Sequence, residues 1–145
     1  SDEIDMQALL KTTLRRRPDR IIVGEVRDGA AFDMLKAWNT GHPGGLCTTH
    51  ANDAAESLKR IASLAMEAAT RMPAGMIGRL VASAVNLVIF ISRVNKSEAG
   101  QQTSGRKVRQ LALVSGYDVE KDAYQLVTEE LKALTILREG YSNAT

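Results

Sequence analysis

The sequence predicts an α/β fold in which a mostly parallel sheet is flanked by helices. Strand-like and helix-like segments alternate through the first ninety residues, as in folds of this class. One of these segments, residues 21–26, is a short apolar run rich in β-branched residues. Such a run is typical of a parallel strand that is buried on both faces. The 145 residues, 44% of them hydrophobic, suffice for one domain with its own core.

The first half of the chain reads as helix, strand, helix and strand. Acidic residues up to Asp5 favour a helix N-terminus, and the apolar stripe that follows stops before Pro18. After the strand over 21–26, Asp28 can cap a second helix, which has apolar residues along one face. A glycine-rich turn then leads to a second short strand over 46–49.

The second half begins with two further helices. One starts at Asn52, and the other has Pro73 in its first turn, where proline is favoured. A third apolar strand follows over 87–91, and strands over 108–114 and 124–128 return from it in antiparallel fashion. The sheet is therefore expected to carry an antiparallel addition.

Two further segments remain to be assigned. Residues 93–107 contain Gly, Ser and Gln among charged residues and predict an exposed loop. Residues 129–138 predict a terminal helix.

The amino-acid composition limits the classes of protein to which the chain can belong. The 19 basic and 17 acidic residues leave a net charge of +2, so the bulk charge gives no direct indication of nucleic-acid binding. A single cysteine excludes an internal disulfide and fits a reducing compartment. No apolar run approaches the ~20 residues that a membrane-spanning helix needs.

Two basic clusters leave alternatives open. The run from Arg15 to Arg17, together with Arg20, could contact nucleic acid, but solvated charges at a helix C-terminus are the favoured interpretation. The second cluster could face anionic lipid or a protein partner, with a solvated loop as the default. It comprises Arg93, Lys96, Arg106, Lys107 and Arg109.

Glu25 closes the segment IIVGE within the run over 21–26, and the carboxyl ends of such strands are where α/β sheets place their ligands. A carboxylate held there can orient an attacking water or help to hold magnesium. The motif is weak alone, because many buried strands are followed by a surface glutamate. Both histidines of the protein follow within TGHPGGLCTTHAN, and two histidines around a glycine-rich turn indicate a site.

A metal site is the other interpretation of these histidines. His42, Cys47 and His50 are residue types that bind zinc, but their spacing fits no zinc pattern and a fourth ligand is not evident. Cys47 is better explained as a small core residue of a strand.

RPDRIIVGEVRD and TGHPGGLCTTHAN together resemble the Walker B and His-box motifs of the secretion, or traffic, ATPases. The residues of these two motifs are most similar to those of the conjugal-transfer and type IV secretion branch, with its TrbB-type ATPases. The match runs from about Met6 to Leu64. The resemblance implies a RecA-like P-loop ATPase domain, of which residues 1–145 form the C-terminal part.

The resemblance also implies roles for single residues. Glu25 matches the Walker B acid, which polarises the attacking water and supports magnesium through its water shell. His50 matches the His-box histidine, expected near the γ-phosphate. His42 matches a histidine that points toward a neighbouring subunit or the phosphate-sensing network.

Arg27 matches the arginine of the GExR motif, whose guanidinium could stabilise a charged interface or a phosphate. A salt bridge with Asp28 or Asp33 explains Arg27 equally well. Thr48 and Thr49 could donate hydrogen bonds in the active-site strand, and Thr48, with His42 and Arg27, is expected to bind the nucleotide cofactor. The sequence departs from the family at Thr49, where an apolar residue is common.

A P-loop, GxxxxGK followed by Ser or Thr, is required by an ATPase of this class and is absent from the sequence. Two segments have its glycine spacing, but Gly29 is followed by Ala30, and Gly105 by Arg106 and Lys107. The acidic box expected upstream of Walker B is missing too. We therefore expect the first half of the nucleotide-binding domain to precede Ser1 and the present chain alone to be inactive.

The resemblance thus predicts an ATP-hydrolysing motor subunit of a conjugation or type IV secretion machine, with ATP and Mg²⁺ as cofactors. It implies a homo-oligomeric, hexameric ring that is cytoplasmic, peripheral to the inner membrane and in contact with membrane-embedded secretion proteins. The alternatives are an ATPase of the type II secretion or type IV pilus branch and a non-enzymatic ring-assembly module. A basic DNA-binding domain is a third, less favoured alternative.

Overall fold

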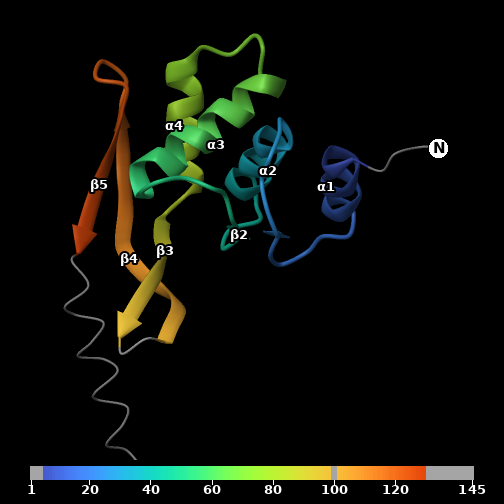
Figure 1. Ribbon diagram of the computed structural model, residues 1–145. Helices are drawn as coiled ribbons and strands as arrows, with labels where there is room; N and C mark the ends of the chain where they lie inside the picture. Colours follow the sequence, from blue (N-terminus) through green and yellow to red (C-terminus); the bar gives the residue numbers. More distant parts are fainter. Residues whose placement is uncertain (1–4, 99–100, 130–145) are drawn as a thin grey trace, which may run out of the picture.

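The computed structural model describes residues 5–98 and 101–129, which form helices and two separate sheets (Figure 1). The described elements, in chain order, are α1 (Met6–Leu14), β1 (Ile22–Val23), α2 (Ala30–Asn39), β2 (Leu46–Cys47), α3 (Ala54–Ala68), α4 (Ala74–Ala84), β3 (Leu87–Glu98), β4 (Gln101–Asp118) and β5 (Ala123–Glu129). The helix expected over 129–138 lies almost wholly outside the described residues. Within the described part of the chain, no helix has the length and apolar character needed to cross a membrane.

The parallel pair is short. β1 and β2 run parallel with Ile22 opposite Leu46, which confirms the predicted strand direction. The side chain of Val23 is buried, whereas Ile22 is 69% exposed. The expectation of a strand buried on both faces is therefore wrong for the described residues. Successive side chains of a strand point to opposite faces, and the helical core covers only one face of this pair.

The larger sheet is antiparallel, with strand order β3-β4-β5. The return of the strands expected over 108–114 and 124–128 is confirmed. The expectation of a mostly parallel sheet is wrong for the described residues, because most strand residues lie in the antiparallel strands β3, β4 and β5.

The loop expected over 93–107 is also wrong. Residues 93–98 and 101–107 continue the β3–β4 ladder, with Arg93 opposite Arg106. Ladder hydrogen bonds join backbone groups, so polar side chains do not prevent them from forming.

The core lies between the helices and one face of the antiparallel sheet. Its largest fully buried side chains come from α2, α3 and α4 and are Met34, Leu35, Leu58, Leu64, Ile77 and Val81. Val88, Val114 and Leu126 pack against this core from the sheet. α4 approaches β4 closely, since a Cβ on Gly78 would lie 2.3 Å from the ring of Tyr117.

Two helices begin at aspartates whose side chains cap the helix N-terminus. The Asp5 carboxylate accepts a hydrogen bond from the backbone N–H of Ala8 at 2.7 Å, as an N-cap does. The Asp53 carboxylate accepts one from Glu56 at 2.7 Å and thereby fixes the start of α3. The start of α3 matters for the site, because the segment that carries His50 leads directly into this helix.

Candidate functional site

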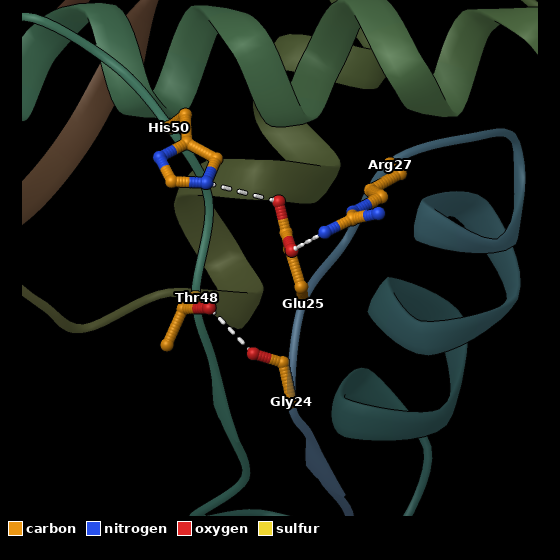
Figure 2. A network of polar contacts seen from close by, with 5 residues as sticks. All are labelled: Gly24, Glu25, Arg27, Thr48 and His50. Atoms are coloured by element: carbon orange, nitrogen blue, oxygen red, sulfur yellow. Dashed lines mark hydrogen bonds and ion pairs between the residues drawn. The ribbon is translucent and has the colours of Figure 1, made fainter.

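Glu25 and His50 follow the two parallel strands at their carboxyl ends. Because β1 and β2 run in the same direction, these ends lie at the same edge. Contacts continue beyond the strands: the N–H of Val26 donates to the carbonyl of Thr48 at 3.0 Å, and the Thr48 hydroxyl donates to the carbonyl of Gly24 (Figure 2). The two segments are thus held side by side where their polar side chains begin.

The Glu25 carboxylate lies between two basic side chains (Figure 2). Arg27 Nη2 donates to Glu25 Oε2, and His50 Nε2 lies 3.2 Å from Glu25 Oε1. Only 24% of the Glu25 side chain is exposed, against 76% for Arg27 and 93% for His50. A largely covered acid therefore has two solvent-facing partners.

These partners set the protonation of Glu25. The hydrogen bond from Arg27 lowers the pKa of Glu25, and the charges of Arg27 and His50 act in the same direction, against the opposing effect of desolvation. Glu25 in turn raises the pKa of Arg27. Glu25 is consequently a carboxylate at neutral pH, able to accept hydrogen bonds.

Arg27 pairs with Glu25 and not with the two aspartates considered from the sequence. Asp28 accepts a hydrogen bond from the backbone N–H of Ala30, and Asp33 pairs with Lys36 at 3.8 Å. The salt bridge expected with Asp28 or Asp33 is therefore wrong.

An open pocket of about 560 Å³ lies beside this network. Its walls are the segment after β1, the segment after β2 and one face of α3. The lining residues are Glu25, Val26, Arg27, Thr49, His50, Ala51, Asn52, Glu56, Lys59, Arg60 and Ser63. Of the site residues predicted from the sequence, the pocket thus brings together Glu25, Arg27 and His50.

The pocket-lining residues of α3 were not identified as site residues from the sequence. Glu56, Lys59, Arg60 and Ser63 follow one another at the spacing of a single helix face. This spacing was the available signal, but it predicts only a polar face. The segments after β1 and β2 line the same pocket, and this tertiary arrangement makes that face a pocket wall.

Thr48 and Thr49 have different positions. The Thr48 hydroxyl bonds to the Gly24 backbone and joins the two segments, whereas Thr49 contributes to the pocket lining. Thr48 thus has a positioning contact here, and the predicted contact of Thr48 with a cofactor stays a prediction.

His42 lies away from the pocket. It is in the turn between α2 and β2, at the amino end of β2, whereas His50 follows the carboxyl end. Its Nδ1 is buried and has no hydrogen-bond partner among the described residues. The structure does not bring His42 to Glu25, so its predicted role stays a prediction.

Cys47 is a partly buried residue of β2 that packs against the core, in line with the core interpretation. Burial raises the pKa of its thiol to about 11. The thiol therefore stays protonated at neutral pH, whereas zinc is bound by thiolate. In the described part of the chain, no group of three or more His, Cys, Asp or Glu residues is placed to hold a metal ion.

The family model and similar relatives point to the same protein family. The family model described as "Type II/IV secretion system protein" matches residues 1–135. The conjugal transfer protein TrbB of Rhizobium radiobacter is 50% identical over 117 residues, which are 81% of this chain and 32% of that protein. A probable TrbB of Sinorhizobium fredii is 44% identical over 135 residues, 90% of this chain and 37% of that protein.

A solved structure shares the fold. The VirB11 ATPase of the Brucella suis type IV secretion system, in complex with sulphate, superposes with a TM-score of 0.64 at 27% identity. The match covers 74% of this chain and 31% of that one. The chain therefore spans about a third of the length of the relatives that it matches.

Proposed function

This chain belongs to the type II/IV secretion system protein family, and from that premise we propose that it is part of the ATP-hydrolysing motor subunit of a conjugal-transfer or type IV secretion machine. The TrbB relatives favour the conjugal-transfer branch over the type II secretion and pilus branches. The observation that carries the proposal is the Glu25 carboxylate, which Arg27 and His50 hold in the lining of a pocket.

Glu25 is the group that acts on water in this proposal. Both of its oxygens have a basic neighbour, and each keeps a further lone pair with which to accept a hydrogen bond from water. The strand before Glu25 limits its movement, so the carboxylate can hold that water in one orientation. His50 faces the same space and is the residue we assign to the γ-phosphate side.

The pocket suits a magnesium nucleotide in its chemistry. It offers a carboxylate oxygen, the ligand type that Mg²⁺ prefers, together with basic side chains for phosphate. Bound Mg²⁺ would neutralise charge on the phosphates during transfer. Because Glu25 is already engaged by Arg27 and His50, we assign it to the water shell of the ion.

We further propose that the chain is the C-terminal part of a RecA-like domain whose P-loop lies in another part of the protein. The relatives are about three times as long as the matched span, which leaves room for that part. In the described residues, β2 and β3 each have a free edge where further strands could pair. A hexameric, cytoplasmic ring at the inner membrane and contact with membrane-embedded secretion proteins complete the proposal.

Replacing Glu25 by glutamine in the full-length protein tests the proposed role. We expect ATP binding to persist and turnover to fall by about 100-fold or more, because the amide cannot act as a base toward water. ATP binding and phosphate release are the measurements. Asp33→Asn is the matched control, since Asp33 pairs with Lys36 outside the pocket and its loss should leave turnover near normal.

Near-normal turnover in Glu25→Gln would show that another group activates the water. Absence of turnover in the unmodified full-length protein would favour the non-enzymatic ring-assembly module. For the 145-residue chain alone we expect no turnover and weak nucleotide binding. Tight, magnesium-dependent ATP binding by this chain would contradict the proposed half-site.

A further inference from the structure

We propose that Lys59 and Arg60 form a phosphate-binding wall of the pocket, holding the phosphate groups of a nucleotide from the α3 side. The inference rests on the proposed function and adds two residues to its site. Figure 2 shows α3 crossing above the Glu25 network, and both side chains line the pocket that Glu25 and His50 share.

The packing of α3 fixes the direction of these side chains. On one face of the helix, Leu58, Ile61 and Leu64 are at most 4% exposed and belong to the core. Lys59 and Arg60 lie on the face that lines the pocket. Turning this face away would expose the buried side chains to water, so the helix holds both cations at the pocket.

The charge of the wall is not neutralised. In the described part of the chain, neither Lys59 nor Arg60 has a carboxylate within 4.0 Å. The acids of the pocket have other partners, because Glu25 pairs with Arg27, and Glu56 accepts a hydrogen bond from Asn52 at 2.9 Å. Against the single carboxylate of Glu56, Lys59 and Arg60 therefore leave the α3 side of the pocket with a net positive charge to offer an anion.

Phosphate is the ligand chemistry that fits this wall. A guanidinium presents several N–H donors to phosphate oxygens, and a neighbouring ammonium adds a mobile point charge. Ser63 and Asn52 line the same pocket as uncharged hydrogen-bonding groups. The Glu25 carboxylate repels an anion, so the phosphates are held toward α3 and a water fits between them and Glu25.

The test uses the 145-residue chain and inorganic tripolyphosphate in magnesium-free, low-salt buffer, with calorimetric titration as the measurement. We expect the double variant Lys59→Gln/Arg60→Gln to bind at least about tenfold more weakly, because two charge-assisted contacts are lost. The matched control is Lys11→Gln/Arg79→Gln, which removes the same two charge types from exposed positions outside the pocket lining. The control should change affinity by less than about twofold.

Equal weakening in the two double variants would overturn the proposal, since it would reduce the effect to net charge. Circular dichroism and thermal unfolding should show that both variants fold as the unmodified chain does. A Glu25→Gln chain supplies a second readout: it should bind tripolyphosphate more tightly, because a negative charge leaves the same pocket. Unchanged affinity in that variant would place the anion elsewhere and also overturn the proposal.

The outcomes separate this inference from the proposed function. If Lys59→Gln/Arg60→Gln loses tripolyphosphate binding while Glu25→Gln still hydrolyses ATP in the full-length protein, the phosphate wall stands and the role of Glu25 falls. If hydrolysis depends on Glu25 while the double variant binds tripolyphosphate normally, the proposed function stands and the wall falls.

Discussion

Glu25 depends on one neighbour that is local in sequence and one that is distant. Arg27 is two residues away, and on extended backbone residues two apart share a face, so their contact needs little more than the local conformation. His50 is reached only because β1 and β2 pair in parallel and the Thr48 hydroxyl bonds to the Gly24 carbonyl. The two contacts of a single carboxylate therefore have different physical origins.

Replacing Arg27 by glutamine should raise the pKa of Glu25 toward the ordinary glutamate value. The Arg27 hydrogen bond is the largest cause of the lowered pKa, and its charge acts in the same direction. Because the pKa is lowered in the folded state, the pairing stabilises the fold above the ordinary pKa and is lost as the pH falls through the lowered value. Carboxyl-carbon NMR shifts of Glu25 against pH are the measurement.

The control for this titration is Lys36→Gln, which removes a cation that pairs with Asp33. It should leave the Glu25 curve in place. A Glu25 titration that is the same with and without Arg27 would contradict the assigned cause.

At the scale of elements, the turn before β2 is shaped by a tryptophan. Trp38 Nε1 donates to the carbonyl of Ile21 at 3.3 Å, which ties the end of α2 to the start of β1. A Cβ on Gly45 would lie 2.0 Å from that same nitrogen, so only glycine fits there. Gly41 and Gly44 have φ of +100° and +75°, which favour glycine for a different reason.

Gly45→Ala should lower the free energy of unfolding by about 1–3 kcal/mol, because the methyl group forces Trp38 from its position. Urea unfolding followed by the fluorescence of this single tryptophan is the measurement. Gly24→Ala is the matched control: nothing lies within 4 Å of the Cβ position, and we expect a change of about 0.5 kcal/mol or less. Equal losses in both variants would contradict the contact with Trp38.

At the scale of the whole molecule, one face of the antiparallel sheet packs against the helices, and the other is open as far as residues 5–98 and 101–129 are concerned. The open face consists of side chains from all three strands that are about half exposed, namely Leu87, Ile89, Ile91, Leu113 and Val127. Strand register places Leu113 opposite both Leu87 and Val127, so these side chains form a continuous apolar patch. Contiguous exposed apolar patches are a feature of interaction surfaces.

The open face should bind an apolar fluorescent dye, and Ile89→Thr/Leu113→Thr should weaken that binding severalfold while the fold is kept. Both positions are about half exposed, so the added hydroxyls stay in contact with water. Val88→Thr is the contrasting variant, because Val88 packs against the core and its replacement should cost about 1 kcal/mol or more of stability. Dye fluorescence and thermal unfolding are the measurements, and unchanged dye binding in the double variant would contradict the exposed patch.

Much of the local structure could be predicted from the sequence. The Asp5 cap and the helix with Pro73 at its start depend on residues a few positions apart. So does the strand predicted over 21–26, of which the structure forms Ile22–Val23. The assignment of residues 93–107 failed because polar composition carries little information on a ladder whose bonds join backbone groups. The expectation that both faces of β1 are buried was wrong, because the burial of a face depends on which distant segments pack against the strand.

By itself, the sequence determined the family, the place of the Glu25 carboxyl just after a strand and the order of most elements, because motifs, caps and periodicity are properties of neighbouring residues. Only the tertiary structure decided that His50 meets Glu25, that His42 lies at the other end of β2 and that α3 turns Lys59 and Arg60 into the pocket. These relations join segments that are far apart in the chain. Their geometry follows from strand pairing and from the burial of one helix face, which no local pattern contains.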